Sequence, residues 1–175
     1  MSLREVFDVP NEAWKIVYFE KPGRENTDET LRLARERAKE LDIRNIVVAS
    51  SSGATGVKAA EVFKGYNLVV VTHVTGFREP NVQWFLPENR AVLEKNGVKI
   101  ITAAHAFGTL GRAVNRKFNT IQVDEIIANV LRLFSQGLKV ACEVTCMATD
   151  AGYIRTDEDA IGIGGSGGGA DTAIV

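Results

Sequence analysis

Ile46-Val47-Val48-Ala49-Ser50-Ser51-Ser52-Gly53-Ala54-Thr55-Gly56 decides the fold of this chain, because it joins two different patterns. Its first four residues are apolar on both faces, as strands buried inside a parallel sheet are. The following residues are small and rich in hydroxyls, and apolar residues at helical spacing continue from Val57 to Phe63. A buried strand, a tight turn and a helix in that order form the repeating unit of α/β proteins.

Strand and helix patterns alternate on both sides of this unit. Short apolar runs predict further strands at 16–19, 68–71, 98–101, 160–163 and 173–175. Helical spacing, capping residues and closing glycines predict helices at 26–41, 57–63, 87–96, 123–136 and 138–151. Asn26 and Glu29 are spaced as a capping box at the first of these helices. Residues 103–120 are basic and interrupted by glycines, so a long functional loop with one helical turn is expected there.

This alternation predicts a mostly parallel sheet with helices on both faces, which is a three-layer α/β/α fold. No internal repeat or linker divides residues 1–175, so a single domain is expected. Ligands of such folds bind at the carboxyl ends of the strands, near a topological switch point. The loops that follow strands are therefore where a site is expected.

Composition and charge narrow the classes of function. The chain is 45% hydrophobic and 25% charged, with a net charge of −1, so no overall field favours nucleic acid or an anionic membrane. Residues 1–8 carry charges where a signal peptide needs an apolar run. No apolar stretch reaches the roughly 18 residues that a membrane helix requires. A cytoplasmic protein without nucleic-acid or membrane partners is expected.

One predicted helix carries most of the remaining reactive side chains. Cys142 and Cys146 lie four residues apart on it and are interpreted as buried thiols in a reducing compartment. Glu143 and Asp150 are interpreted as capping or solvated groups. No ligand set accompanies the cysteines, so no metal site is predicted.

The turn from Ser50 to Gly56 is suited to an anion. With little side-chain bulk its backbone N–H groups can approach a phosphate, its hydroxyls supply more donors, and the helix N-terminus adds a favourable dipole. It matches neither the Walker A nor the Rossmann pattern. The alternative is a helix cap that binds nothing, and the three consecutive serines favour the phosphate site.

A second glycine-rich stretch lies near the end of the chain, Gly162-Ile163-Gly164-Gly165-Ser166-Gly167-Gly168-Gly169-Ala170-Asp171-Thr172. So many glycines lose much conformational entropy on ordering, which is understandable if a ligand lies directly on the backbone. Gly164, Gly165, Ser166 and Gly167 are the expected contacts. A flexible loop is the competing interpretation.

The only two histidines follow neighbouring predicted strands. His73 stands after Thr72 at the end of one strand, and His105 stands just after the next. Both are candidates for acid–base catalysis near neutral pH, and Thr72 and His73 are also candidate ligand contacts. For each histidine, a structural role in fixing the loop backbone is an equal alternative.

At these loops the sequence resembles the C-terminal α/β domain of pyruvate kinase. That domain has a Thr-x-Ser-Gly-x-Ser/Thr phosphate loop, to which Ser50, Ser52, Gly53 and Thr55 correspond. It also has a Gly-Ser-Gly loop before its last strand, to which Gly165-Ser166-Gly167 corresponds. The resemblance implies a five-stranded sheet whose last strand is antiparallel, with both loops at one pocket. It implies no pyruvate kinase activity, because the catalytic barrel is lacking, and it leaves open a missing C-terminal piece.

The chain is more similar still to a group of stand-alone archaeal relatives of that domain. The motifs that carry this likeness are Tyr18-Phe19-Glu20-Lys21-Pro22-Gly23, Val71-Thr72-His73-Val74-Thr75-Gly76-Phe77 and His105-Ala106-Phe107-Gly108. Some members carry flavin mononucleotide (FMN), so the resemblance implies a flavin phosphate on the Ser/Gly loop. Three functions are expected to compete: a module, regulatory or not, that binds FMN or another phospho-metabolite; a flavin-dependent or phosphate-ester enzyme using His73 or His105; and a purely structural domain. A homo-oligomer is left open.

Overall fold

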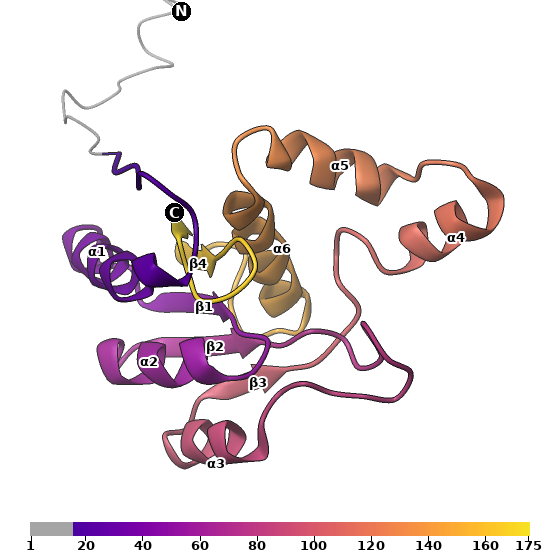
Figure 1. Ribbon diagram of the computed structural model, residues 1–175. Coiled ribbons are helices and arrows are strands. Elements are labelled where there is room, and N and C mark those ends of the chain that lie inside the picture. The colour runs from indigo at the N-terminus through magenta and orange to yellow at the C-terminus, as the bar shows by residue number, and fades with distance from the viewer. Residues whose placement is uncertain (1–15) are drawn as a thin grey trace, which may run out of the picture.

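The computed structural model describes residues 16–175 and places five strands in one sheet with the order β3-β2-β1-β4-β5 (Figure 1). The strands are β1 (Asn45–Ala49), β2 (Asn67–Val71), β3 (Lys99–Ile101), β4 (Ala160–Gly164) and β5 (Thr172–Ile174). β1 pairs in parallel with β2 and β4, β2 pairs in parallel with β3, and β5 runs antiparallel to β4. The mostly parallel sheet with an antiparallel last strand is confirmed.

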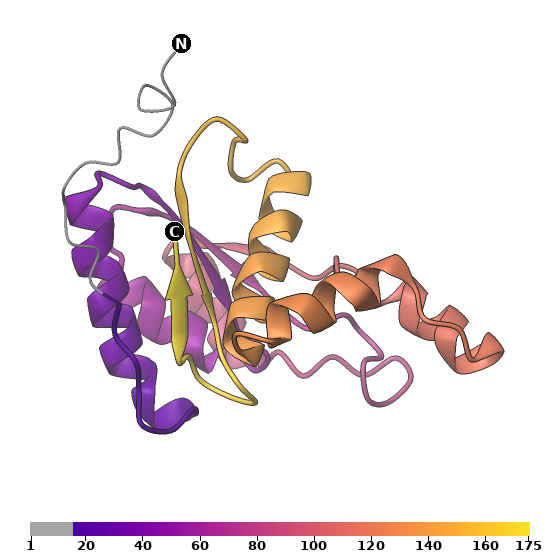
Figure 2. The same ribbon diagram turned by 90° about the horizontal axis from the view of Figure 1, so that it is seen from above.

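Helices cover both faces of this sheet (Figure 2). They are α1 (Thr27–Glu40), α2 (Ala54–Val62), α3 (Pro87–Lys95), α4 (Leu110–Phe118), α5 (Val123–Arg132) and α6 (Gln136–Asp150), and a short 3-10 turn, η2 (Arg24–Asn26), precedes α1. α1, α2 and α3 pack on one face and α6 packs on the other, which gives the three layers expected.

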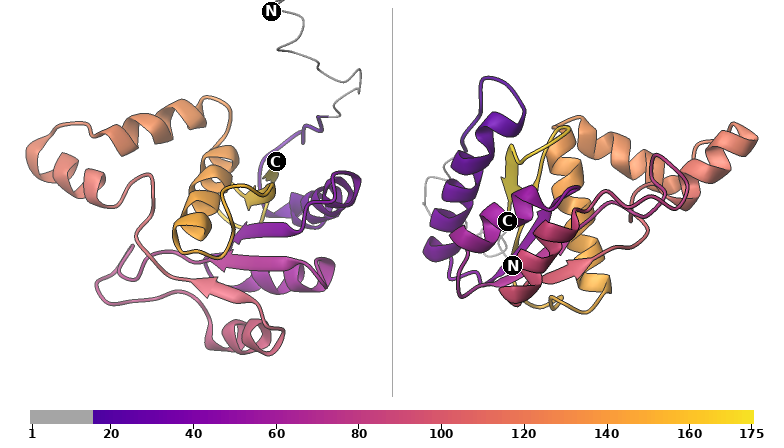
Figure 3. Two further views of the ribbon diagram at one scale, coloured as in Figure 1. Left: turned by 180° about the vertical axis from the view of Figure 1, so that it is seen from behind. Right: turned by 60° about the horizontal axis from the view of Figure 1, so that its bottom comes forward.

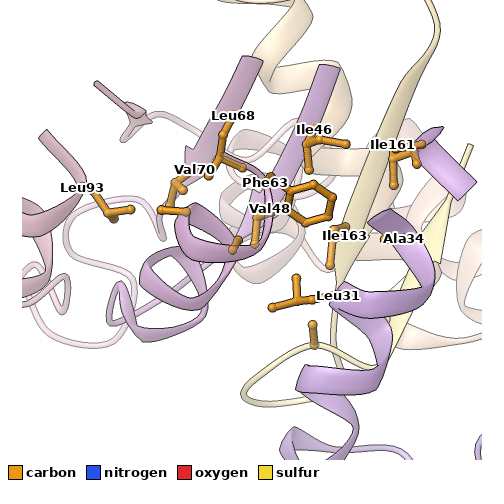
Figure 4. Packing of buried hydrophobic residues seen from close by; sticks show 14 of the residues in the cluster. Leu31, Ala34, Ile46, Val48, Phe63, Leu68, Val70, Leu93, Ile161 and Ile163 are labelled. Carbon is orange, nitrogen blue, oxygen red and sulfur yellow. The ribbon is translucent and has the colours of Figure 1, made fainter. Parts of the chain in front are cut away.

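The core lies mainly between the sheet and the first three helices. Alternate strand residues point to opposite faces, so Ile46 and Val48 meet Leu31 and Phe63 on this side (Figure 4). Val47 points to the other face, where it joins the smaller cluster under α6. Burying one large aliphatic side chain contributes about 1.5–3 kcal/mol, and this double-sided burial explains why β1 is apolar throughout.

Two predicted elements were wrong. Residues 16–19 form no strand: Ile16 is 70% exposed and Tyr18 is 85% exposed. An apolar run becomes a strand only when another strand supplies its hydrogen bonds, and β4 pairs with β5 instead. Residues 103–120 are not one long loop, because they contain the helix α4. Gly108 lies just before that helix, and Asn119 ends it with a left-handed backbone at φ 51°.

Two helix ends also differ from the prediction. The expected helix over 123–136 stops at Arg132, because the Ser135 side chain caps the next helix by accepting a hydrogen bond from the Leu138 N–H at 2.9 Å. The capping box of Asn26 is absent. Its side chain donates to the Lys21 carbonyl at 2.7 Å, although α1 does begin directly after it.

The strand order creates a switch point between β1 and β4. The chain leaves β1 toward β2 and β3 on one side, then returns to place β4 on the other side of β1. Loops after β1 and β4 therefore diverge from neighbouring strand ends, and such an opening is where ligands bind in α/β folds. The N-terminus of α2 and that of α1 lie at this same carboxyl edge of the sheet, because each helix is antiparallel to the strand beside it.

α4 and α5 form a hairpin that projects away from the sheet as an arm (Figure 3). α5 packs against α6 and α4 packs against α5. No helix within residues 16–175 combines the length and apolar character needed to cross a membrane. Residues 1–8, whose charges argued against a signal peptide, lie outside the described residues.

Candidate functional site

The Ser/Gly loop after β1 uses part of its hydrogen-bonding capacity internally. The buried Ser50 hydroxyl accepts from the Gly56 N–H at 3.1 Å, so it caps α2. The Ser52 carbonyl accepts from the Leu86 N–H at 3.0 Å and from the Asn89 side chain at 2.9 Å. The Ser50 side chain therefore caps α2, whereas the two Ser52 bonds to the loop of Leu86 and Asn89 are made by its backbone carbonyl.

Three other residues of this loop are fixed by packing. Gly53 has φ 94°, and a Cβ there would lie 2.6 Å from the Asn89 Cβ. A Cβ on Gly56 would lie 3.0 Å from Val70, and Thr55 is buried. Ser51 and Ala54 are the exposed positions of the loop. The Ala54 and Gly56 amides of the first turn of α2 already donate to the Ser52 and Ser50 hydroxyls, so Ser51 is the exposed hydroxyl residue of the loop.

The glycine-rich loop between β4 and β5 is held in place by Asp171. This carboxylate accepts hydrogen bonds from the N–H groups of Gly23 and Ser166, both at 3.0 Å, and from the Thr172 hydroxyl at 2.9 Å. The Ala170 N–H donates to the Thr27 hydroxyl at 3.0 Å. These bonds seat the loop on the start of α1, so it has a defined conformation in which Gly167 is exposed.

Arg24 stands beside this loop, and the sequence interpretation missed it. A Cβ on Gly168 would lie 3.4 Å from Arg24 Nη2, so the guanidinium lies along the glycine backbone. Within the part of the chain that the structure describes, its side chain has no carboxylate partner. The signal available in the sequence was Arg24 itself, a cation that lies just before the start of the first predicted helix.

A second cluster forms at the ends of β2 and β3. The His73 and His105 rings lie 5.5 Å apart, His73 stacks on Phe77 at 4.6 Å, and its ring contacts Trp84 edge-on at 5.8 Å. His105 Nε2 accepts from the Val74 N–H at 3.2 Å, so the neutral ring carries its proton on Nδ1. His73 Nδ1 is buried without a hydrogen-bond partner among residues 16–175.

A buried ion pair lies behind these histidines, which corrects the interpretation of Glu143 as a capping or solvated group. Lys139 and Glu143, on successive turns of α6, approach to 2.6 Å with side chains 4% and 6% exposed. Glu143 also accepts from the Phe107 N–H at 3.0 Å, so it fixes the loop that carries His105. Asp150 is exposed, as expected.

Burial governs the protonation of this cluster. It lowers the pKa of His73, and the positive charge of Arg78 lowers it further, against the opposing effect of Glu143. Burial also lowers the pKa of His105, although Glu143 opposes this shift. The pKa of Lys139 is lowered by burial too, with Glu143 opposing. Both histidines are therefore neutral at pH 7, where each ring offers one donor and one acceptor.

The two parts of the site are connected through the loop after β2. Gln83 donates to the His73 carbonyl at 2.9 Å, and the same loop reaches Ser52 through the Leu86 N–H. Thr72 is buried, and its hydroxyl bonds the Thr102 hydroxyl at 2.7 Å and the His73 carbonyl at 2.8 Å. Gly164 is buried too, and it packs against the backbone of α6.

The cysteines differ from the prediction. Cys142 is half-buried and Cys146 is exposed, because the helix face that carries them turns partly away from the sheet. The partial burial of each side chain nevertheless raises the pKa of both thiols. Among residues 16–175, no group of three or more His, Cys, Asp and Glu side chains is arranged to hold a metal ion.

Known proteins that resemble this chain include one protein family and several solved structures. The family model described as "Pyruvate kinase, alpha/beta domain" matches residues 28–175. Two solved pyruvate kinases of Cryptosporidium parvum are 14% and 17% identical, with TM-scores of 0.45 and 0.40 over 85% and 81% of this chain. The chain spans only 22% and 21% of their lengths. An NH3-dependent NAD synthetase from Campylobacter jejuni is 13% identical, with a TM-score of 0.42 over 81% of this chain and 56% of that one.

Proposed function

We propose that this chain, which belongs to the pyruvate kinase alpha/beta-domain family, binds a phosphorylated small molecule, FMN in the first instance, at the carboxyl edge of its sheet. One observation carries the proposal. The N-termini of α1 and α2, the glycine-rich loop and the Arg24 guanidinium gather around the switch point between β1 and β4. Backbone amides, helix dipoles and an arginine are the groups that proteins use to hold phosphate.

The phosphoryl group would be held by the Arg24 guanidinium, the Ser51 hydroxyl and the amides around Gly167, and the N-terminal dipole of α2 would favour its negative charge. Asp171 is a carboxylate of the same glycine-rich loop. It already accepts three hydrogen bonds, which direct its negative charge into the loop. This donor set fits a phosphate monoester.

The ring would be held by the cluster of His73, Phe77 and Trp84. His73 stacks on Phe77 at 4.6 Å and meets Trp84 edge-on at 5.8 Å. Arg78 lies over the Trp84 ring at 3.9 Å, so a planar heterocycle would stack on Trp84 in place of the Arg78 guanidinium. Bound FMN would supply one- and two-electron redox chemistry, while the neutral histidines offer hydrogen bonds to ring heteroatoms. We place the protein with the stand-alone archaeal relatives in the cytoplasm, on the motifs around Tyr18, Thr72 and His105 that resemble theirs.

The test begins with an absorbance scan of the purified full-length chain and mass spectrometry of what denaturation releases. Bound or added FMN should be detected, and a hundredfold excess over its dissociation constant should stabilise the fold by about 2.7 kcal/mol. Riboflavin, which lacks the phosphate, should bind much more weakly. Equal binding of FMN and riboflavin, or no binding of either, would contradict the phosphate assignment.

Arg24→Ala supplies the residue-level test. Losing a charged hydrogen bond of about 1.5–3 kcal/mol should weaken FMN binding roughly tenfold to a hundredfold. Riboflavin binding should hardly change. Arg155→Ala is the matched control, because Arg155 is also exposed, follows the C-terminal end of α6 and pairs with Asp157 instead of approaching the glycine loop.

An enzymatic role is the second candidate. It is favoured by the Nδ1 atom of His73, which has no hydrogen-bond partner in the described part of the chain. A neutral histidine beside a bound ring or phosphate ester could exchange a proton with it. If a substrate is found, His73→Gln should reduce kcat at saturating FMN by at least tenfold. Unchanged turnover in this variant and in His105→Gln would exclude both histidines as catalytic residues.

A further inference from the structure

The arm formed by α4 and α5 exposes the apolar side of both its helices. No residue of α4 is buried, and Ala128 is the only buried residue of α5. On α4 the exposed stripe is Leu110, Val114 and Phe118, at intervals of four residues. On α5 it includes Val123, Ile126, Ile127 and Val130. Spacing of this kind normally faces a core.

Helices this short do not stand alone in water. α4 has 9 residues and α5 has 10, whereas isolated helices below about 12–15 residues are marginal even in favourable sequences. Most helical stability in proteins comes from packing the apolar face, and the described residues of this chain do not cover that face.

The stripes flank an open groove. It measures about 570 Å³ and runs between Leu110 and Val114 on one side and Val123 and Ile127 on the other, with Ala104–Phe107 at its base. A groove lined by facing apolar stripes fits apolar side chains of a further helix.

The exposed area matches one half of a stable dimer interface. Ten large apolar side chains of the hairpin and the turn after it are each between 37% and 82% exposed. At roughly 150–250 Å² for a fully exposed aromatic side chain, and less for the eight aliphatic ones, they present together up to about 1,000 Å². One partner of a standard interface contributes about 800 Å², whereas the largest patch on a typical monomer is about 300–600 Å².

The charges of the hairpin favour α5 over α4 of a second copy as the contact for α4. α4 carries Arg112, Arg116 and Lys117 and no acidic residue, while the first turn of α5 carries Asp124 and Glu125. None of the three cations makes an ion pair within residues 16–175. Packing α4 on α4 of a second copy would oppose like charges, whereas α5 of a second copy has the opposite charge in its first turn. Asp124 and Glu125 also contact Gly111 and Asn115 of α4 in their own chain.

We propose that the chain assembles through this arm, with α4 of each copy packed against α5 of a second copy related by a two-fold axis. Two helix hairpins joined in this way form a four-helix bundle. The same contact appears twice, as a two-fold interface requires. The bundle would lie beside the loop of His105, which leads directly into α4.

Sedimentation velocity of the full-length chain over a range of concentrations tests the proposal. The wild type should sediment as a dimer, or as a larger assembly containing it. Val130→Glu should raise the dissociation constant at least a hundredfold, because it places a charge in the apolar stripe. Val92→Glu is the matched control: Val92 is 43% exposed on α3, close to the 52% of Val130, and should leave assembly unchanged.

Three results would overturn this inference. The first is a wild type that stays monomeric at every concentration. The second is an assembly that survives Val130→Glu, because the contact would then lie elsewhere. The third is an effect of Val92→Glu equal to that of Val130→Glu. Lys117→Glu adds a charge test, since it should weaken assembly more at low salt than at high salt.

Discussion

Lys139 and Glu143 behave at the residue scale as one unit, because both charges are withdrawn from water. Glu143→Gln keeps an oxygen for the Phe107 N–H but leaves the Lys139 ammonium without its counter-charge. Removing one member of a buried pair lowers the free energy of unfolding by about 3–5 kcal/mol. Urea unfolding at pH 7 should show such a loss, and the double replacement Lys139→Met with Glu143→Leu should lose much less.

The exposed pair of Arg90 and Glu94 provides the control. It is also spaced by four residues, at 3.4 Å, with side chains 38% and 59% exposed. Glu94→Gln should change the free energy of unfolding by less than about 1 kcal/mol, since water screens such pairs. Equal effects of the Glu94 and Glu143 replacements would mean that the α6 pair is not buried in solution.

The histidines should make stability depend on pH in a defined window. Burial holds the pKa values of His73 and His105 below the ordinary histidine value of about 6.5, so the unfolded chain binds more protons just below that pH. Stability should therefore be fully present above about pH 6.5 and fall as pH decreases toward the folded-state pKa values. Urea midpoints measured from pH 7.5 to 5.5 should show this decline.

A variant assigns that decline to the histidines. The double variant His73→Phe with His105→Gln keeps a ring on Phe77 and an acceptor for the Val74 N–H while removing both titrations. Its urea midpoint should be nearly flat over the same pH range. A decline as steep as that of the wild type would assign the pH dependence to other groups.

The residues of this site were predicted unevenly from the sequence. The position of the Ser/Gly loop and of both histidines followed from the strand pattern alone, because loops after parallel strands share one edge. Glu143 was misinterpreted because its burial depends on the loop of Phe107, which is 36 residues away in the chain. Lys139 at a spacing of four residues was the visible signal of a pair.

At the scale of the element, the junction between β1 and α2 depends on Gly53. Gly53→Ala introduces a side chain at φ 94° and places its Cβ 2.6 Å from the Asn89 Cβ. Backbone strain and overpacking each cost about 1–3 kcal/mol. Urea unfolding should therefore show a larger loss in the free energy of unfolding than backbone strain alone would cause.

Gly65→Ala separates these two contributions. Gly65 has a similar φ of 85°, but a Cβ there meets nothing within 4 Å. Gly65→Ala should show the backbone strain without the steric contact. Its loss of unfolding free energy should therefore be smaller than that of Gly53→Ala by about 1–3 kcal/mol. Equal losses would show that the loop around Gly53 moves away from Asn89.

The elements that the sequence mispredicted share a physical cause. Residues 16–19 satisfy the composition of a strand, but strand formation depends on a partner that composition does not reveal. α4 was expected as a loop because its glycines and basic residues suggested an irregular segment. Gly108 and Asn119 proved to be its boundaries, and the interval from Leu110 to Phe118 held the helical signal.

At the scale of the whole molecule, the sheet and the arm have different sources of stability. The sheet is covered on both faces by its own helices, whereas the arm has one buried residue in its two helices. If a second copy covers the arm, its amide hydrogens should exchange slowly only in the assembled state. The arm is then the part of the chain whose local stability depends on protein concentration.

Hydrogen exchange followed by mass spectrometry measures this difference directly. Diluting the wild type below its dissociation constant, or introducing Val130→Glu, should speed exchange in α4 and α5 by at least tenfold. Exchange in β1 and β2 should stay unchanged, because their hydrogen bonds lie in the covered sheet. Val92→Glu should reproduce the wild-type pattern. Slow exchange of α4 in a proven monomer would show that the hairpin is stable by itself, and the exposed stripes would then need another explanation than a second copy.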